Sequence, residues 1–166
     1  MGKKSQKTGV FVVLLLLSGV SVWVAGCEKK TPEPRTAEVK IGTNSWVVEL
    51  AMTQKSRHKG LSGRRELSEG SGMLFIYPEA ISLNFCMREC FIPIDIVFIG
   101  ADLRVVNTYA MQVEPGRRGL ANYSSGIPAQ YVLELPGDTV EKCGIKNGDL
   151  VELVDVPDAA HAETAE

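Results

Sequence analysis

Asp95 is the residue whose type and setting most strongly suggest chemistry. It lies within the segment Ile92–Ile99, which is otherwise apolar. Because burial of an unpaired charge costs several kcal/mol, a carboxyl group in this segment must be paired or protonated. A guanidinium is a suitable partner, since it forms two parallel hydrogen bonds with a carboxylate. The candidate partners are Arg57, Arg64 and Arg88.

Two interpretations of such a pair stay open. In the first, the ion pair is structural and fixes a helix on a sheet. In the second, it belongs to a polar site in which an arginine binds an anionic ligand or Asp95 acts as a base. Asp95 and the three arginines therefore form the main candidate polar site.

Three cysteines, Cys86, Cys90 and Cys143, lie in the second half of the chain. In a straight strand the Cα atoms of residues 86 and 90 would be about 13 Å apart, whereas a disulfide needs about 4.4–6.8 Å. A Cys86–Cys90 disulfide thus requires a turn, and a Cys90–Cys143 disulfide is an open alternative. Free buried thiols and a thiol or metal site are the other interpretations. Zinc would need a fourth ligand, and we predict no bound metal or other cofactor.

Known catalytic sequence motifs do not occur in the chain. It has no G-x-S-x-G elbow, no phosphate-binding loop, no G-x-G-x-x-G fingerprint and no paired-histidine metal motif. Its two histidines are His58, within a basic run, and His161, near the end. The pattern favours a binding protein over an enzyme, although the enzyme question stays undecided at this point.

The glycine-rich stretch 114–126 carries few strand signals and is predicted to be a long loop. Long loops on a rigid β scaffold commonly carry binding residues. We therefore take Arg117, Tyr123 and Ser124 as candidate loop contacts. The alternative is an ordinary surface loop.

The first 26 residues have the pattern of an export signal. Three lysines precede the apolar run Val10–Val24, and the chain then reads Val24-Ala25-Gly26-Cys27. This tetrapeptide resembles a bacterial lipobox, which implies that residues 1–26 are a lipoprotein signal peptide and that the Cys27 sulfur carries a diacylglyceryl group. We expect a protein that is lipid-anchored on the extracytoplasmic side of the cell membrane or the outer membrane. An uncleaved N-terminal anchor is the alternative.

The remainder divides into a tether, one domain and a tail. Residues 27–36 are polar and proline-containing, residues 37–156 have the length and composition of one domain, and residues 157–166 are predicted to be a disordered tail. The chain carries 18 Lys and Arg against 20 Asp and Glu, and three of the lysines lie in the leader. A mildly acidic domain gives no reason to expect a nucleic-acid partner. We expect a monomeric domain.

Short apolar segments with a period of two dominate the domain. Strands are predicted at 37–41, 46–51, 73–77, 83–87, 92–99, 103–113, 131–135 and 150–154, with short helices after Thr53 and at 138–143. Many short strands at this spacing predict a mainly β protein, a compact β-sandwich or barrel-like single domain with one or two short helices. The segment 92–99 is apolar enough for a strand buried on both faces.

Several sequence blocks, in this order, carry a family resemblance. They are Gly60-Leu61, Gly72-Met73-Leu74-Phe75, Phe85-Cys86-Met87-Arg88-Glu89-Cys90, Ile92-Pro93-Ile94-Asp95-Ile96, Tyr131-Val132-Leu133-Glu134 and Gly144-Ile145-Lys146. The chain resembles the DUF192 family over residues 40–153. The resemblance implies a compact β-rich fold, often behind an export signal, and no established activity. Residues 85–90 depart from the family's Phe-Trp-Met-Lys-Asn-Thr, so a ligand stacked on that tryptophan would be bound differently here.

Together these observations predict a lipid-anchored extracytoplasmic binding or accessory module for an envelope ligand or protein. It contacts the membrane through Cys27. The alternatives are an enzyme that uses Asp95 with a nearby arginine, or a thiol or metal site at Cys86 and Cys90.

Overall fold

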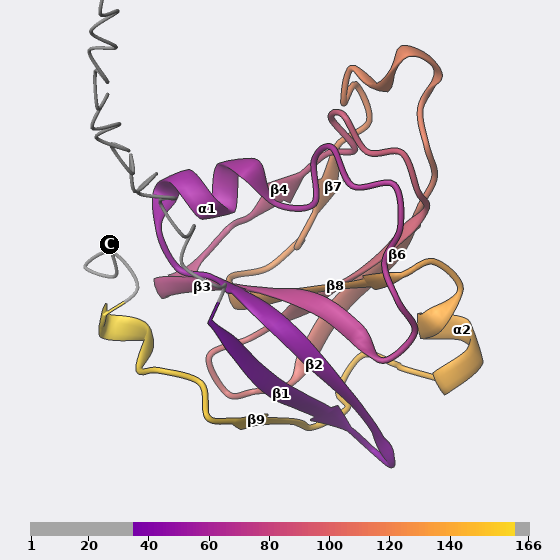
Figure 1. Cartoon of the computed structure of the whole chain (residues 1–166). Coiled ribbons are helices and arrows are strands. Elements are labelled where there is room, and N and C mark those ends of the chain that lie inside the picture. Colours follow the sequence, from indigo (N-terminus) through magenta and orange to yellow (C-terminus); the bar gives the residue numbers. More distant parts are fainter. Residues whose placement is uncertain (1–34, 162–166) are drawn as a thin grey trace, which may run out of the picture. The chain divides into compact units, whose positions relative to one another are not determined.

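The structure, a computed structural model, describes residues 35–161 (Figure 1). The predicted signal peptide, the lipidated Cys27 and nearly all of the tether lie outside the described residues, as do residues 162–166. Within residues 35–161, no helix combines the length and the hydropathy that a membrane crossing requires.

The described chain is mainly β, as predicted. Seven strands form one sheet in the order β6-β5-β8-β3-β2-β1-β9, and β4 and β7 form a separate two-stranded ribbon. The strands are β1 (Thr36–Ile41), β2 (Asn44–Ala51), β3 (Ser71–Ile81), β4 (Asn84–Phe85), β5 (Ile94–Ile99), β6 (Val105–Met111), β7 (Tyr123–Ser124), β8 (Ala129–Pro136) and β9 (Val151–Val154). The helices are α1 (Gln54–Lys59) and α2 (Thr139–Cys143), with 3₁₀ turns η1 (Pro115–Arg117) and η2 (Ala159–His161).

The large sheet curls into a half-barrel. Its two outer strands approach each other at one end, where Arg104 and Leu150 form an antiparallel bridge. The Val105 N–H donates to the Asp149 carbonyl at 3.0 Å, and the Val151 N–H donates to the Leu103 carbonyl at 2.8 Å. These bonds pair part of each sheet edge, which would otherwise expose unpaired backbone groups. The barrel-like single domain predicted from the strand spacing is confirmed.

Both faces of the central strands are buried. One core cluster lies inside the curl and includes Leu74, Val97 and Leu133. The other lies on the opposite face and includes Phe75, Phe98 and Val132. Successive residues of a strand point to opposite faces, so β3, β5 and β8 supply alternate residues to the two clusters. Every residue of β5 is buried, as its apolar sequence predicts.

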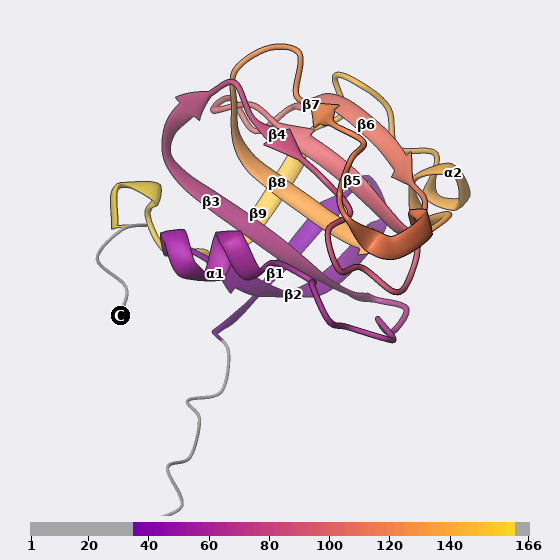
Figure 2. The ribbon, with the colours of Figure 1, turned by 90° about the horizontal axis from the view of Figure 1, so that it is seen from above.

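The second cluster is covered by α1, the β4–β7 ribbon and the loops beside them (Figure 2). Helix α1 lies in the connection between β2 and β3, which pair in parallel and so need a crossover. Thr53 caps this helix as predicted: its Oγ1 accepts a hydrogen bond from the Ser56 N–H at 3.1 Å, and the Ser56 Oγ accepts one from the Thr53 N–H at 2.9 Å. This reciprocal capping box fixes where the helix begins.

Three local predictions differ from the structure. Strand β3 continues through Pro78 to Ile81, because the pairing with β8 shifts register between Ile76 and Ile81 and leaves Pro78 exposed. Tyr123 and Ser124, predicted within a loop, form β7 against β4. The described part of the predicted disordered tail forms η2, and Ala159 packs into the first cluster.

Candidate functional site

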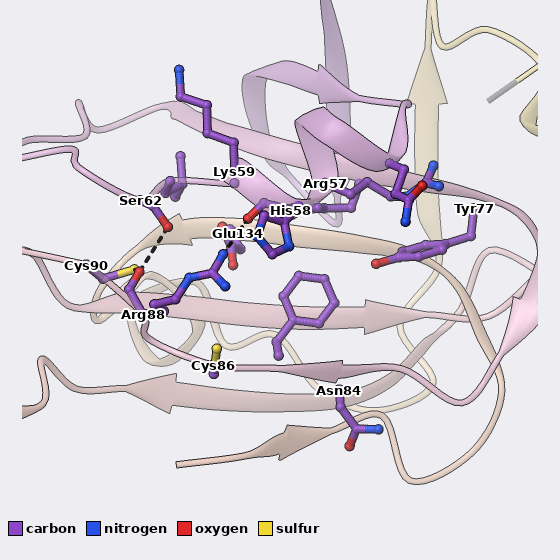
Figure 3. Close-up of a pocket in the computed structure, with 15 residues that line it drawn as sticks. Arg57, His58, Lys59, Ser62, Tyr77, Asn84, Cys86, Arg88, Cys90 and Glu134 are labelled. Atoms are coloured by element: carbon purple, nitrogen blue, oxygen red, sulfur yellow. Dashed lines mark hydrogen bonds between the residues drawn. The ribbon is translucent and has the colours of Figure 1, made fainter. Parts of the chain in front are cut away.

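A cleft of about 400 Å³ opens on the second face of the sheet (Figure 3). One wall is α1 and the residues that follow it, and the other is β4 with the loop at residues 86–90. Its floor is formed by β3 and β8. Pockets of this volume accommodate small molecules. Polar side chains that line the cleft include those of Arg57, His58, Lys59, Tyr77, Arg88 and Glu134.

Arg57 attaches the helical wall to the sheet. Its Nη1 donates hydrogen bonds to the carbonyl of Met52 and, at 2.9 Å, to the carbonyl of Ile76. Its guanidinium also lies 4.8 Å from the centroid of the Tyr77 ring. A planar guanidinium is suited to such combined hydrogen bonding and stacking. Arg57 therefore holds α1 against β3 at the edge of the cleft.

The two walls of the cleft are tied to each other by hydrogen bonds to backbone carbonyls. The Ser62 Oγ donates to the Arg88 carbonyl at 2.9 Å, and the Arg88 Nη2 donates to the His58 carbonyl at 2.9 Å. The Gly63 N–H donates to the Glu89 carbonyl at 2.9 Å. Glu89 itself has φ = 54°, in the left-handed region that residues with a Cβ seldom adopt. These contacts place Arg88 at the mouth of the cleft.

Glu134 lies on the floor of the cleft and is the most unusual residue there. It sits on β8 with Met73 of β3 and Ile96 of β5 as its partners on either side, so neither strand offers it a polar side chain. Only 5% of its surface is exposed. Among the described residues its Oε2 has no hydrogen-bond partner. A buried carboxyl oxygen in this position lacks the compensation that protein interiors normally provide.

Burial raises the pKa of Glu134 to about 8, although the nearby Arg64 acts in the opposite direction. Arg64 is already paired with Glu49 through its Nη2. Loss of hydration disfavours the charged form of a carboxyl group. Glu134 is therefore a neutral acid at pH 7, with an O–H group available as a donor.

The other titratable groups beside Glu134 are also held neutral. Burial raises the pKa of the Cys90 thiol to about 11, and the carboxyl of Glu134 acts in the same direction. Burial raises the pKa of Tyr77 as well, against the influence of Arg57. Lys59 and Arg88 add positive charge to the lining. The cleft thus combines a cationic rim with a floor of neutral donors.

The structure separates Asp95 from its predicted arginine partners. Asp95 follows the same alternation as Val97 and therefore points into the curl of the sheet, whereas Arg57 and Arg88 line the cleft on the opposite face. Its Oδ2 accepts a hydrogen bond from the Val140 N–H at 2.7 Å, at the start of α2. The predicted pairing of Asp95 with an arginine is wrong, because sheet alternation directs the carboxyl group to the other layer. Burial raises its pKa, and hydrogen bonds from the start of α2 oppose the rise.

The three cysteines of the domain are free thiols in the structure. Cys90 belongs to the second cluster and Cys143 packs against the first, so the sheet separates them and the alternative Cys90–Cys143 disulfide is wrong. Cys86 is exposed and Cys90 buried, and both line the cleft without a disulfide between them. Over residues 35–161, no group of three His, Cys, Asp or Glu side chains is arranged to hold a metal ion.

The candidate loop residues contribute to the scaffold near the cleft. Arg117 stacks on the Phe91 ring at 4.4 Å, and its carbonyl accepts the Glu89 N–H at 2.8 Å. The Tyr123 ring meets the Tyr109 ring edge-on at 5.6 Å. The Ser124 carbonyl accepts hydrogen bonds from Tyr109 and from the side chain of Asn107 on β6. None of the three predicted loop contacts lines the cleft.

Glu134 was not among the site residues predicted from the sequence. The same kind of pattern that pointed to Asp95 also occurs at Glu134, which is the single carboxyl group within the apolar run Tyr131–Leu135. Which of the two acids faces the arginines depends on the face to which each points, and that is fixed by strand register and by the path of the crossover.

Comparisons with known proteins agree on the fold. The model of the DUF192 family, described as Uncharacterized ACR, matches residues 37–153. A crystal structure of a putative transcription regulator from Sinorhizobium meliloti 1021 is similar with a TM-score of 0.67 and 30% sequence identity, covering 72% of this chain and 95% of that chain. A protein of unknown function from Novosphingobium aromaticivorans DSM 12444 is similar with a TM-score of 0.64 and 35% identity, covering 72% of this chain and 84% of that one. The comparison with curated proteins finds no match.

Proposed function

The chain belongs to the DUF192 family, and we propose that it is a binding module that holds a small polar ligand in the cleft above Glu134. The observation that carries this proposal is that Glu134 lines the cleft while its buried Oε2 has no partner among the described residues. An unpaired buried polar atom costs free energy. A bound ligand that hydrogen-bonds to it would offset that cost.

The proposal includes the cellular setting expected from the N-terminal sequence. We propose that Cys27 is lipidated, that the domain is anchored on the extracytoplasmic side of the cell membrane or outer membrane, and that its ligand is an envelope molecule. The basic leader, the apolar run and the Val24-Ala25-Gly26-Cys27 tetrapeptide support this. Replacement of Cys27 by alanine is expected to abolish incorporation of radiolabelled fatty acid and to release the protein from membranes.

A binding role is favoured over catalysis by the contents of the cleft. It is lined by His58 on the exposed surface of α1 and by the neutral Glu134, and Asp95 is on the other side of the sheet. We do not propose a role in transcription regulation, the description given to the Sinorhizobium protein, because residues 27–166 of this chain carry 15 Lys and Arg against 20 Asp and Glu. Contact with nucleic-acid phosphates relies on clustered positive charge.

Native mass spectrometry of the full chain, expressed with its own leader and purified without dialysis, tests the binding role. A bound small molecule is expected on the natural chain and on Asp95→Asn, which alters a buried carboxyl group on the opposite face. It is expected to be lost from Glu134→Leu. Because Cys86 is exposed and lines the cleft, removal of the molecule should also speed alkylation of Cys86. Equal retention by Glu134→Leu and the natural chain would contradict the proposal.

A further inference from the structure

We propose that the ligand of the cleft is an oxyanion, a carboxylate or phosphate group on a small molecule, and that the protonated Glu134 donates a hydrogen bond to it. This inference rests on the proposed binding role of the cleft and names the chemistry of its ligand. It follows from two features of the lining: the sign of the charge at the rim and the kind of hydrogen-bonding group at the floor.

The rim is positively charged. Lys59 and Arg88 line the cleft from its two walls. Among the described residues that line the cleft, Glu134 is the only carboxylic acid. A cationic ligand would meet the like charges of Lys59 and Arg88, whereas an anion would meet complementary charge in a partly desolvated site, where such interactions are strengthened.

The floor lacks an acceptor for the proton of Glu134. Met73 and Ile96 flank it on the sheet, and its Oε2 has no partner among the described residues. Arg64, which acts on Glu134 electrostatically, already forms an ion pair with Glu49. A carboxylic acid that is protonated carries one O–H donor. A ligand oxygen that bears negative charge is the strongest acceptor for such a donor.

The arrangement makes binding depend on the proton of Glu134. An ionised Glu134 would repel an oxyanion placed against it, so only the protonated form binds. Of the groups that face Glu134, burial holds the pKa of Cys90 at about 11 and keeps Tyr77 above its ordinary value. Arg57, Arg64 and Arg88 stay charged throughout. Glu134, with a pKa of about 8, is then the buried group of the cleft that titrates near neutral pH.

The test uses four sugars that share one ring and differ in charge: D-glucuronate, D-glucose 6-phosphate, D-glucose and D-glucosamine. Binding to the full-length chain is measured by titration calorimetry, first with the natural chain and then with His58→Gln and Cys86→Ser present in every protein, since both of these side chains are exposed and line the cleft. At pH 7 at least one of the two anions is expected to bind, with the neutral and cationic sugars at least about tenfold weaker. The two anions separate a carboxylate ligand from a phosphate ligand.

The pH dependence of the affinity tests whether the proton of Glu134 is needed for binding of the anion. Affinity for D-glucuronate, whose carboxylate is ionised throughout, is expected to be nearly constant from pH 6 to 7.5 and to fall by up to about tenfold per pH unit above pH 8. For D-glucose 6-phosphate, whose phosphate itself titrates near pH 6, the fall is read above pH 8 only. Glu134→Gln keeps a neutral donor, so it should bind at pH 7 within about threefold of the parent and lose the fall above pH 8. Glu134→Leu should weaken binding about tenfold or more from pH 6 to 7.5, where Glu134 of the parent is protonated. Asp95→Asn should change neither the affinity nor its pH profile.

The oxyanion assignment would be overturned if glucosamine bound more tightly than either anion. It would also be overturned if neither anion bound at 20 mM, which is about the weakest affinity that still defines a site. An unchanged pH profile in Glu134→Gln would overturn the role of its proton. These outcomes are separate from the failure of the binding role itself. A neutral or cationic molecule found on the natural chain by mass spectrometry, and lost from Glu134→Leu, would leave that role intact while rejecting the oxyanion.

Discussion

Replacement of Glu134 by glutamine is expected to remove much of the pH dependence of the domain's stability between pH 5 and 8. The carboxyl group of Glu134 titrates at about 8 in the folded chain, against 4.5 for an ordinary glutamate. Between these values the unfolded chain ionises while the folded chain keeps the proton. The folded state then binds more protons, so the free energy of unfolding falls as the pH rises.

The size of the effect follows from the two pKa values. Each pH unit between them changes the free energy of unfolding by about 1.4 kcal/mol. Over the whole window the loss is about 5 kcal/mol, of which about 3 kcal/mol has occurred by pH 7. The contribution is fully present below pH 4.5 and is lost as the pH rises to about 8. For a single domain, whose total stability is about 5–15 kcal/mol, this is a large fraction.

Urea unfolding of residues 28–166 at pH 5, 6, 7 and 8 measures the effect. Trp46, which is buried in the first cluster, supplies a fluorescence signal. Glutamine has nearly the shape of glutamic acid and does not ionise, so Glu134→Gln should show a much flatter profile and exceed the natural chain in stability at pH 8. The control is Glu79→Gln, an exposed glutamate of β3. The reasoning is refuted if the natural chain and Glu134→Gln have parallel profiles.

Substitutions at other positions test the scaffold around the cleft. Glu89→Asn, at φ = 54°, should raise stability by about 0.5–1 kcal/mol, because asparagine tolerates the left-handed region better; a lower melting temperature in calorimetry would contradict this. Asp95→Ala, which loses the hydrogen bond from the Val140 N–H, should cost about 1–2 kcal/mol in urea unfolding, and Asp95→Asn, which can still accept that bond, should cost clearly less. Iodoacetamide should modify the exposed Cys86 well before the buried Cys90, whose pKa is about 11; equal rates by mass spectrometry would count against the structure of the cleft.

Local chemistry predicted much of the fold. The helix after Thr53, the short helix α2 and the fully buried β5 all follow from residues close together in sequence. Strand β3 was cut short at Pro78, since tolerance of a proline depends on a register shift with a distant strand. Likewise β7 exists only because β4 pairs with it. Two-residue strands of this kind have no periodicity of their own.

The site could be predicted only in part, for a reason of geometry. Alternation shows which residues of one strand share a face, but it does not show which layer of the fold that face meets. Asp95 and Glu134 look alike in sequence, as single acids in apolar strands. In the folded sheet Asp95 faces α2 and Glu134 faces the cleft that Arg57 and Arg88 line. The arginines were therefore assigned to the wrong acid.

The contrast between these two acids also indicates which of them serves the scaffold. Both are buried, both have a raised pKa, and each has one carboxyl oxygen without a partner among the described residues. However, the other oxygen of Asp95 accepts a 2.7 Å hydrogen bond at the start of α2, which partly offsets the cost of its burial. Glu134 lies between Met73 and Ile96 and costs about 3 kcal/mol at pH 7 with no comparable contact in return. A leucine there would pack against the same neighbours without that cost. Perturbed acids in clefts concentrate at functional sites, and a ligand of the cleft would explain why a residue that destabilises the domain stands at this position.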